Sequence, residues 1–168
     1  IGRFVKEKQL DHLIKAYRKF LESGHQTKLY LFGKDEDHQL AMMKDLISEY
    51  QLEDMVKISN YTKKPLVEFG KSKASLLTSK YEGFGLTIME SIEVGCPVLS
   101  YDVRYGPNEI INHGKNGYLI ERNNIDSLAQ HMVDIIENPM QHVKNQDKLK
   151  YSAAVKNYQH LLQTFNLL

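Results

Sequence analysis

The chain of 168 residues has no tryptophan, a single cysteine, four prolines and no long apolar run. Because Cys96 has no second cysteine to pair with, an internal disulfide is excluded, which fits a reducing compartment. No stretch approaches the roughly 20 apolar residues that a transmembrane helix needs. Neither charge is in excess, since 22 Lys and Arg face 21 Asp and Glu, and this excludes the strongly basic surface of a duplex nucleic-acid binder. These absences indicate a soluble, cytoplasmic protein whose partners must be sought at local sites.

What is present suffices for one globular domain. Hydrophobic residues make up 42% of the chain, enough to bury a sizeable core without a second domain. The sequence opens without methionine on "IGRF", as though cut inside or just after a strand. We therefore expect residues 1–168 to be a single domain of a longer protein.

Short apolar runs alternate with helical patterns along the chain. Helices are expected over residues 9–22, about 37–50, 64–73, 86–94 and from about 124 onward. Strands are expected over residues 28–33, 55–59, 74–79, 97–101 and 117–120. Strands that are apolar on both faces and alternate with helices indicate a parallel sheet covered on both sides, a doubly wound, Rossmann-like α/β fold. The more polar residues 139–168 are expected to add peripheral helices.

In such a fold ligands bind where strands end and helices begin. The first loop there, "GRFVKEK", carries Arg3 and Lys8 five residues apart. A planar guanidinium and a compact ammonium together suit a diphosphate. On these residues alone, two solvated charges at a helix entry are the more common interpretation, because Lys and Arg are mostly exposed.

The second loop, "SKYEGFGLT", places two glycines around Phe84 and opens a helix. Glycines let a backbone approach a ligand closely, and the free N–H groups of Gly85, Leu86 and Thr87 form an anion site at the helix start. Glu90 lies on the same helix side as Thr87, away from an apolar row of Leu86, Met89 and Ile92. Glu90 could accept hydrogen bonds from the two hydroxyls of a ribose, and Glu82, before the turn, could hold sugar hydroxyls or stabilise developing positive charge. The alternative is one capping acid and one surface acid.

The third loop, "YDVRYGPNEIINHGKNG", contains turn formers, and Asn108 is expected to cap a short helix. Arg104 and Tyr105 either face the cleft or belong to a plain loop. The seven histidines show no metal-ligand spacing, and no serine or cysteine stands in a nucleophile-elbow pattern. We predict neither a zinc site nor catalysis by a protein nucleophile.

Taken together, "GRFVKEKQLDHLIKAY", "EGFGLTIMESIEVGCPVLSYD" and "GPNEIINHGKNGYLI" resemble a known family. It is the C-terminal, donor-binding domain of retaining GT-B glycosyltransferases, of the glycosyltransferase family 4 type, and the resemblance runs from residue 1 to about residue 138. The "YDVRYGPNEII" version is most similar to bacterial enzymes that glucosylate teichoic acids, or that add sugars to serine-rich surface proteins.

The resemblance implies a role for each matching residue. Arg3 and Lys8 match the pair that neutralises the nucleotide diphosphate, Glu90 the acid that holds the ribose, and Glu82 the acid that contacts the donor sugar. The loop whose backbone touches sugar and phosphate is matched by Gly83, Phe84, Gly85 and Leu86, and Gly33 and Thr87 are also expected to bind the substrate. The sequence departs from the common pattern at Gln9, where many members have glycine, and at Tyr105-Gly106, where many have paired glycines.

The resemblance also implies the chemistry. A hexose passes from a nucleotide sugar, UDP-glucose or UDP-N-acetylglucosamine, to a hydroxyl of a cell-wall polymer, protein or glycan, with retention and without a bound metal. Arg3, Lys8 and the helix start would stabilise the leaving diphosphate. The acceptor binds a separate N-terminal domain, so this chain alone is expected to be inactive. Attachment at the inner face of the membrane stays open.

Two alternatives of other classes remain at this point. A sugar-nucleotide epimerase would share the GT-B fold and the nucleotide site, and a non-catalytic domain could have kept the fold as a binding module. Asn60, Tyr61 and Thr62 could line a base pocket or form an ordinary turn. The choice of UDP rests on the resemblance.

Overall fold

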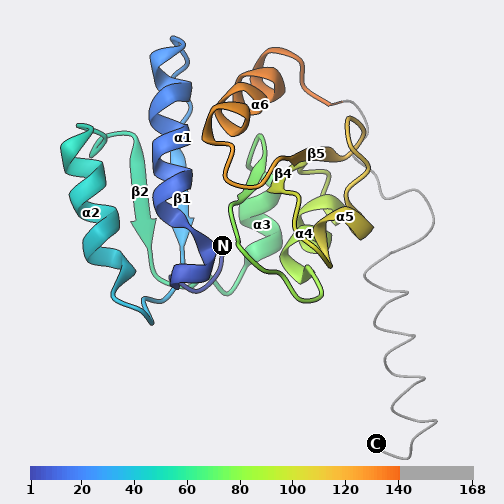
Figure 1. Cartoon of the computed structure of the whole chain (residues 1–168), viewed down its shortest axis with the longest axis horizontal. Coiled ribbons are helices and arrows are strands. Elements are labelled where there is room, and N and C mark those ends of the chain that lie inside the picture. The colour runs from blue at the N-terminus through green and yellow to red at the C-terminus, as the bar shows by residue number, and fades with distance from the viewer. Residues whose placement is uncertain (141–168) are drawn as a thin grey trace, which may run out of the picture.

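A computed structural model describes residues 1–140 of the chain. Within this part the elements alternate as the sequence predicts (Figure 1). The strands are β1 (Leu29–Phe32), β2 (Val56–Ser59), β3 (Ser75–Leu77), β4 (Val98–Tyr101) and β5 (Gly117–Ile120). The helices are α1 (Leu10–Glu22), α2 (Gln39–Glu49), α3 (Pro65–Gly70), α4 (Leu86–Glu93), α5 (Pro107–Ile110) and α6 (Ile125–Glu137), preceded by a 3₁₀ turn over Lys6–Lys8.

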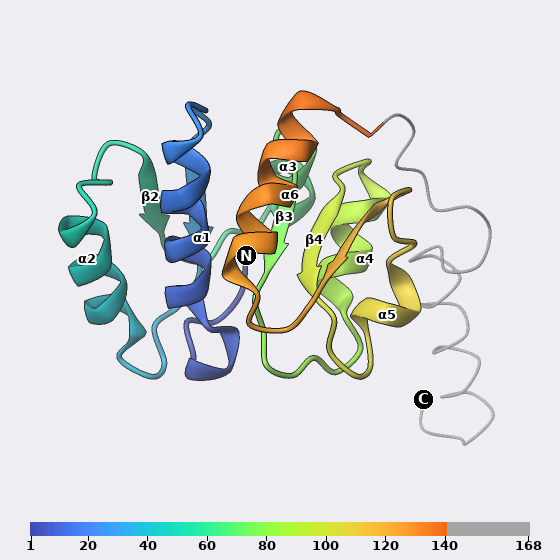
Figure 2. The same ribbon diagram turned by 45° about the horizontal axis from the view of Figure 1, so that its top comes forward.

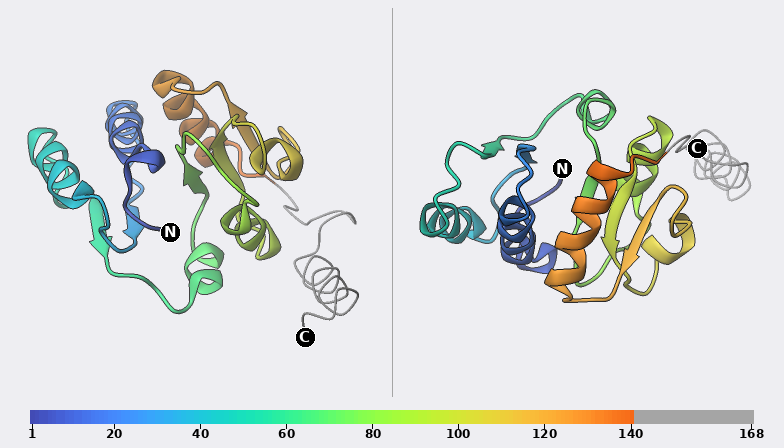
Figure 3. Two further views of the ribbon diagram at one scale, coloured as in Figure 1. Left: turned by 60° about the horizontal axis from the view of Figure 1, so that its bottom comes forward. Right: turned by 90° about the horizontal axis from the view of Figure 1, so that it is seen from above.

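All strand pairs are parallel, which confirms the predicted α/β fold. β1 pairs with β2, and β4 lies between β3 and β5. Helices α1, α2 and α6 cover one face, while α3 and α4 cover the other (Figure 3). The sequence did not predict that the sheet is divided into a two-stranded and a three-stranded part. Because the strands are parallel, their carboxyl ends point to the same edge (Figure 2).

Local signals explain several helix boundaries. Pro65 occupies the first turn of α3, where its missing N–H costs nothing. Asn124 caps α6 by accepting a hydrogen bond from the backbone N–H of Ser127 at 2.9 Å. The prediction that Asn108 caps the short helix was wrong, because Gly106 is the N-cap and Pro107 takes the first helical position.

The core follows from the apolar stripes. The larger cluster joins α1 and α6 to the strands, and fully buried members include Ile14, Leu99 and Leu128. A smaller cluster packs α4 against β4 and α5. Every residue of β4 is buried, as expected for a strand with neighbours on both sides and helices on both faces. Leu86 does not join the buried row of α4, because it is 54% exposed at the helix start.

Gly33 directly follows β1, where the first residues of the chain run parallel to it. A Cβ built on Gly33 would overlap the carbonyl oxygen of Gly2 and lie 2.5 Å from the ring of Phe4. Both contacts are made by a segment that is hydrogen-bonded to the same loop, because the Gly2 N–H donates to the Phe32 carbonyl. Gly33 is therefore required by packing, whatever its contribution to a ligand.

We expect Gly33→Ala to lower the free energy of unfolding by about 3 kcal/mol, because backbone atoms must move to relieve the overlap. Gly70→Ala is the matched control, since a Cβ there meets nothing within 4 Å. The control should leave the stability unchanged or raise it slightly. Urea unfolding of both variants checks the difference, and equal midpoints would contradict it.

The predicted peripheral helices over residues 139–168 fall almost entirely on residues 141–168, outside the described part. Among residues 1–140, no helix combines the length and the apolar character needed to cross a membrane.

Candidate functional site

Lys8 and Glu82 meet at the carboxyl edge of the sheet. The Lys8 ammonium lies 2.6 Å from a carboxylate oxygen of Glu82, and the Ser79 hydroxyl donates to the same oxygen at 2.6 Å. The Glu82 side chain is only 12% exposed, and the hydrogen bonds from Lys8 and Ser79 offset the cost of burying its carboxylate. Two residues 74 positions apart, predicted as parts of one site, are therefore in direct contact.

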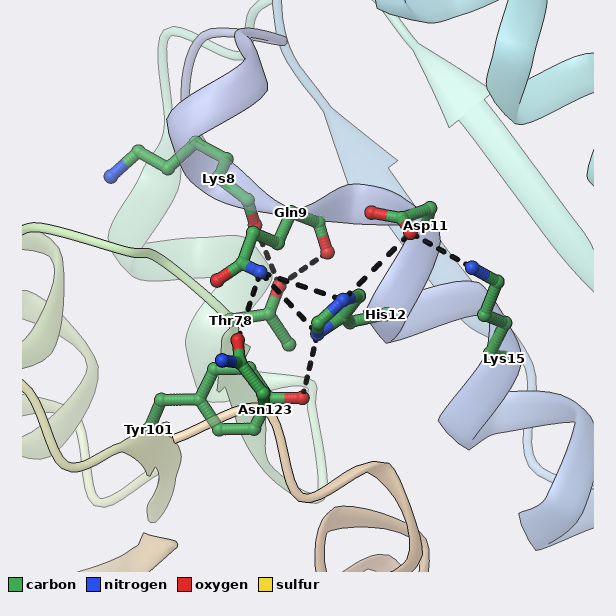
Figure 4. A network of polar contacts seen from close by, with 8 residues as sticks. All are labelled: Lys8, Gln9, Asp11, His12, Lys15, Thr78, Tyr101 and Asn123. Carbon is green, nitrogen blue, oxygen red and sulfur yellow. Dashed lines mark hydrogen bonds and ion pairs between the residues drawn. The ribbon is translucent and has the colours of Figure 1, made fainter. Parts of the chain in front are cut away.

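The backbone of the Lys8 loop is fixed from the neighbouring strand. Thr78, directly after β3, donates its hydroxyl hydrogen bond to the carbonyls of Lys8 and Gln9, at 2.7 and 3.0 Å. The Lys80 N–H donates to the Glu7 carbonyl at 2.7 Å. Figure 4 shows that the Lys8 side chain extends away from these anchors. The backbone of the Lys8 loop is therefore fixed by hydrogen bonds, and the ammonium group of Lys8 points away from them.

A buried polar network continues this anchoring toward α6. Gln9 donates its side-chain amide to Asn123 at 3.0 Å, and His12 contacts the Tyr101 hydroxyl at 3.2 Å (Figure 4). Gln9 has φ 44°, in the left-handed region that favours glycine. Its side-chain oxygen is buried without a hydrogen-bond partner among the described residues. Gln9 and Thr78 were not predicted as support for Lys8, because the network depends on residues far apart in sequence.

The Gly-Phe-Gly loop packs against the third predicted loop. A Cβ on Gly106 would lie 3.2 Å from the Gly83 carbonyl oxygen, so the two turns touch through their backbones. Gly85 is the N-cap of α4 with φ 74°, and it offers no side chain to the helix start. The first N–H groups of α4 therefore keep their donor capacity, as the sequence predicted for an anion site. Phe84 is 64% exposed at the tip of the loop.

Glu90 lies on α4, the helix that begins directly after the Gly-Phe-Gly loop. Burial raises the pKa of Glu90. Glu90 is half-buried and is suited to accept hydrogen bonds from hydroxyl groups of a ligand.

The raised pKa predicts a pH dependence of stability. A carboxyl whose pKa is higher in the folded than in the unfolded state binds its proton more tightly when folded, so stability is lost as pH rises above the unfolded value of 4.5. We expect Glu90→Gln to remove this loss and to gain stability relative to the parent protein at pH 7, but not at pH 4. Glu93→Gln, at the exposed end of α4, is the control. Thermal unfolding at both pH values measures the difference, and a pH-independent gain would contradict it.

Arg3 was predicted to act together with Lys8, but the structure places the two cations in different ion pairs. Its guanidinium donates to a Glu36 carboxylate oxygen at 3.1 Å, and its side chain is 69% exposed. Arg3, Lys8 and Thr87 nevertheless line the same cavity. The structure therefore brings Lys8 and Glu82 into contact and leaves Arg3 at the rim, in an exposed pair that costs little to break.

The third loop places an exposed cation beside the site. The Arg104 guanidinium carbon lies 5.3 Å from the centre of the Tyr105 ring. Tyr105 has φ 70° and Gly106 has φ 79°, so this turn needs two consecutive residues in the left-handed region. Among residues 1–140, no group of three or more His, Cys, Asp and Glu side chains is arranged to hold a metal ion.

Comparisons with known proteins agree on one family. The sequence model of the family described as Glycosyl transferases group 1 matches residues 1–167. A poly(glycerol-phosphate) alpha-glucosyltransferase of Bacillus subtilis (strain 168) is 36% identical over 144 residues, which cover 86% of this chain and 21% of that protein.

Two solved structures are similar in fold and in sequence. A mutant of TarM from S. aureus, in complex with fondaparinux, alpha-GlcNAc-glycerol and UDP, superposes with a TM-score of 0.76 at 31% identity, over 82% of this chain and 28% of that one. The pneumococcal O-GlcNAc transferase GtfA, in complex with UDP and GlcNAc, gives a TM-score of 0.74 at 28% identity, over 83% and 29%. The chain spans less than a third of the length of each of these three proteins.

Proposed function

The chain belongs to the glycosyl transferases group 1 family, and we propose that it is the donor-binding domain of a retaining GT-B hexosyltransferase. One observation carries the proposal. The Lys8 ammonium and the Glu82 carboxylate, from the first two predicted loops, meet at 2.6 Å beside the open N-terminus of α4. This puts a cation, a carboxylate and free N–H groups within one site at the strand ends, where α/β proteins bind nucleotides.

The charges suit a diphosphate next to a sugar. When the bond between the sugar and the leaving phosphate breaks, negative charge grows on the phosphate and positive charge on the ring. Lys8 and the N-terminus of α4 stabilise the negative charge, and Arg3 joins them by exchanging Glu36 for the phosphate. Glu82, in contact with Lys8, stabilises the positive charge on the ring in this proposal. Glu90 binds the ribose hydroxyls.

The relatives indicate the class of donor and acceptor. UDP is present in the structures of TarM and GtfA, and two of the relatives are named a poly(glycerol-phosphate) alpha-glucosyltransferase and an O-GlcNAc transferase. We therefore take UDP-glucose or UDP-N-acetylglucosamine as donor and a hydroxyl of a cell-wall polymer or protein as acceptor. The acceptor binds a second domain, so this chain alone binds the donor without transferring it. The enzyme works in the cytoplasm, at or near the membrane.

Calorimetric titration with UDP-glucose, UDP-N-acetylglucosamine and GDP-mannose tests the proposal. One of the UDP-sugars should bind more tightly than GDP-mannose, and no binding of any of the three to the full-length protein would refute the proposal. Product analysis without acceptor separates the epimerase, which would convert the donor by itself.

Because Lys8, Arg3 and the α4 N-terminus supply positive charge at the diphosphate, we expect donor binding to need no divalent metal. Excess EDTA should leave the dissociation constant for UDP unchanged. Restoration of lost binding by Mg²⁺ or Mn²⁺ after EDTA would contradict this expectation. Titration of UDP in buffer with and without the chelator measures it.

A further inference from the structure

Gln9 is the joint between the turn that carries Lys8 and helix α1. It is the C-cap of the 3₁₀ turn over Lys6–Lys8 and also the N-cap of α1, with φ 44° and ψ 51°. A change in these two angles swings the 3₁₀ turn relative to the helix that follows it. The place of the Lys8 ammonium therefore depends on the conformation of this one residue.

The conformation of Gln9 is costly for a residue with a side chain. Left-handed backbone angles favour glycine, which would turn the chain here without steric strain. The side chain adds a second cost, because Gln9 is only 8% exposed and its Oε1 atom has no hydrogen-bond partner among the described residues. Such costs persist only where the surroundings hold a residue in place. The contacts of the Gln9 side chain must therefore offset them.

Asn123 makes the strongest of these contacts. The Gln9 Nε2 donates to the Asn123 Oδ1 at 3.0 Å, whereas the ring nitrogens of His12 lie at 3.4 and 3.5 Å, near the limit of a hydrogen bond. Figure 4 shows the Gln9 amide nitrogen directed toward both partners. Asn123 lies in the turn between β5 and α6 and has φ 64°. Two left-handed residues, 114 positions apart, are thus joined through their side chains.

The backbone at Gln9 is attached to a different loop. Thr78, which follows β3, donates its hydroxyl hydrogen bond to the carbonyls of Lys8 and Gln9. The joint is therefore fastened twice at the strand ends, by its main chain to the loop after β3 and by its side chain to the turn after β5. Two attachments at different atoms fix the orientation of the joint as well as its place, which one attachment alone would not do.

We propose that Gln9 and Asn123 are positioning residues for sugar transfer, and that their side chains form a clasp that holds Lys8 in place against Glu82. The inference rests on the proposed function, in which Lys8 stabilises the leaving diphosphate. Neither side chain of the clasp touches the donor, because both act through the backbone at Lys8. A charge held at one place stabilises a transition state without reorganisation, whereas a loosened Lys8 still reaches the bound diphosphate. The clasp therefore matters more to turnover than to binding.

Asn123→Gly in the full-length protein tests the clasp. Glycine adopts φ 64° without strain, and Asn123 is exposed, so the turn and the fold should be kept. Loss of the Oδ1 acceptor should lower kcat about 10-fold, because a small misplacement of a reacting group slows the reaction. The Kd for UDP should stay within about twofold, since Lys8 keeps its charge.

Gln51→Gly is the matched control. Gln51 is likewise exposed and left-handed, with φ 55°, and it follows the end of α2. That end of α2 and the Lys6–Lys8 turn lie at opposite edges of the sheet (Figure 1). The control should therefore keep the kcat of the unaltered protein, and any gain in stability from relieved strain should appear in both variants.

A double-mutant cycle separates positioning from general loosening. If Asn123 acts through Gln9, then Asn123→Gly should have no further effect on kcat in a Gln9→Gly protein. A merely structural contribution of the two residues would give additive losses. Hydrogen–deuterium exchange of the segment from Lys6 to Leu10 is a readout that needs no sugar transfer, and exchange there should be faster in both single variants than in the unaltered protein.

Two results would overturn the clasp. One is an Asn123→Gly protein that keeps the kcat and the segment exchange of the unaltered protein. The other is a parallel fall of kcat and UDP affinity with additive losses in the cycle, since this would mean that the whole loop is destabilised. A failure of the proposed function looks different. An unaltered protein that neither binds UDP nor transfers sugar refutes the donor site, while the exchange measurement still decides whether Asn123 holds the Lys8 turn.

Discussion

Replacing Lys8 with alanine in the full-length enzyme is expected to lower kcat/KM about 100-fold, the effect of removing a single preorganised donor at a developing oxyanion. The ammonium is held at one position by Glu82 at 2.6 Å, and the backbone beneath it is fixed by Thr78. Charge at a fixed position stabilises the leaving phosphate without reorganisation. Both the transfer rate and the affinity for UDP should fall, which steady-state kinetics and calorimetry measure.

The substitution also removes the counter-charge of a nearly buried carboxylate, so a loss of folding must be separated from a loss of function. Thermal unfolding of the variant provides that separation. Lys6→Ala is the matched control, because Lys6 is an exposed lysine in the same 3₁₀ turn. Lys8→Arg should recover part of the activity by keeping the charge. Equal activity of Lys6→Ala and Lys8→Ala would remove Lys8 from the site.

The predicted elements came from patterns that are local. Apolar spacing placed α1 and α6, short apolar runs placed β1 to β5, and Asn124 marked the start of α6. These signals depend on neighbours within one or two turns. The division of the sheet could not be predicted in the same way, because strand pairing is set by partners distant in sequence.

The site was predicted in its residue types and only partly in its contacts. Placing Glu82 near Lys8 needed the family resemblance, and their direct ion pair needed the structure. The pairing of Arg3 with Glu36 had no sequence signal, because two exposed charges 33 positions apart form no pattern. Ser79, which donates to Glu82, could have been suspected from its place between β3 and the glycine loop.

The two departures from the family pattern have a common physical meaning. Gln9 and Tyr105 stand where many members have glycine, and both have positive φ, 44° and 70°. A side chain in the left-handed region costs roughly 1 kcal/mol or more. Gln9 offsets part of this strain through its bond to Asn123, and Tyr105 through its contact with Arg104. Both residues therefore hold a backbone conformation that glycine adopts without this cost.

A second large effect is expected from Glu82→Gln, which keeps the shape of the side chain and removes its charge. The amide oxygen can still accept from Ser79 and Lys8, so the fold and the loop should stay in place. Without the carboxylate, positive charge on the sugar ring loses its stabilising partner, and transfer should fall about 100-fold. The affinity for UDP should hold or increase, because a negative charge beside the diphosphate has been removed. The neutral amide also holds Lys8 less tightly, so that the ammonium group can interact with the diphosphate.

This opposite response of binding and turnover is what distinguishes the two roles open to Glu82. If Glu82 only positioned Lys8, the variant would lose UDP affinity and transfer in parallel, as Lys8→Ala should. Glu7→Gln is the control, since Glu7 is an exposed acid in the Lys8 loop, and its backbone carbonyl, not its side chain, accepts the hydrogen bond from Lys80. Calorimetry with UDP and transfer rates for the three variants settle the assignment. A carboxylate that touches the sugar predicts divergence of the two measurements, and a carboxylate that only holds the lysine predicts that they move together.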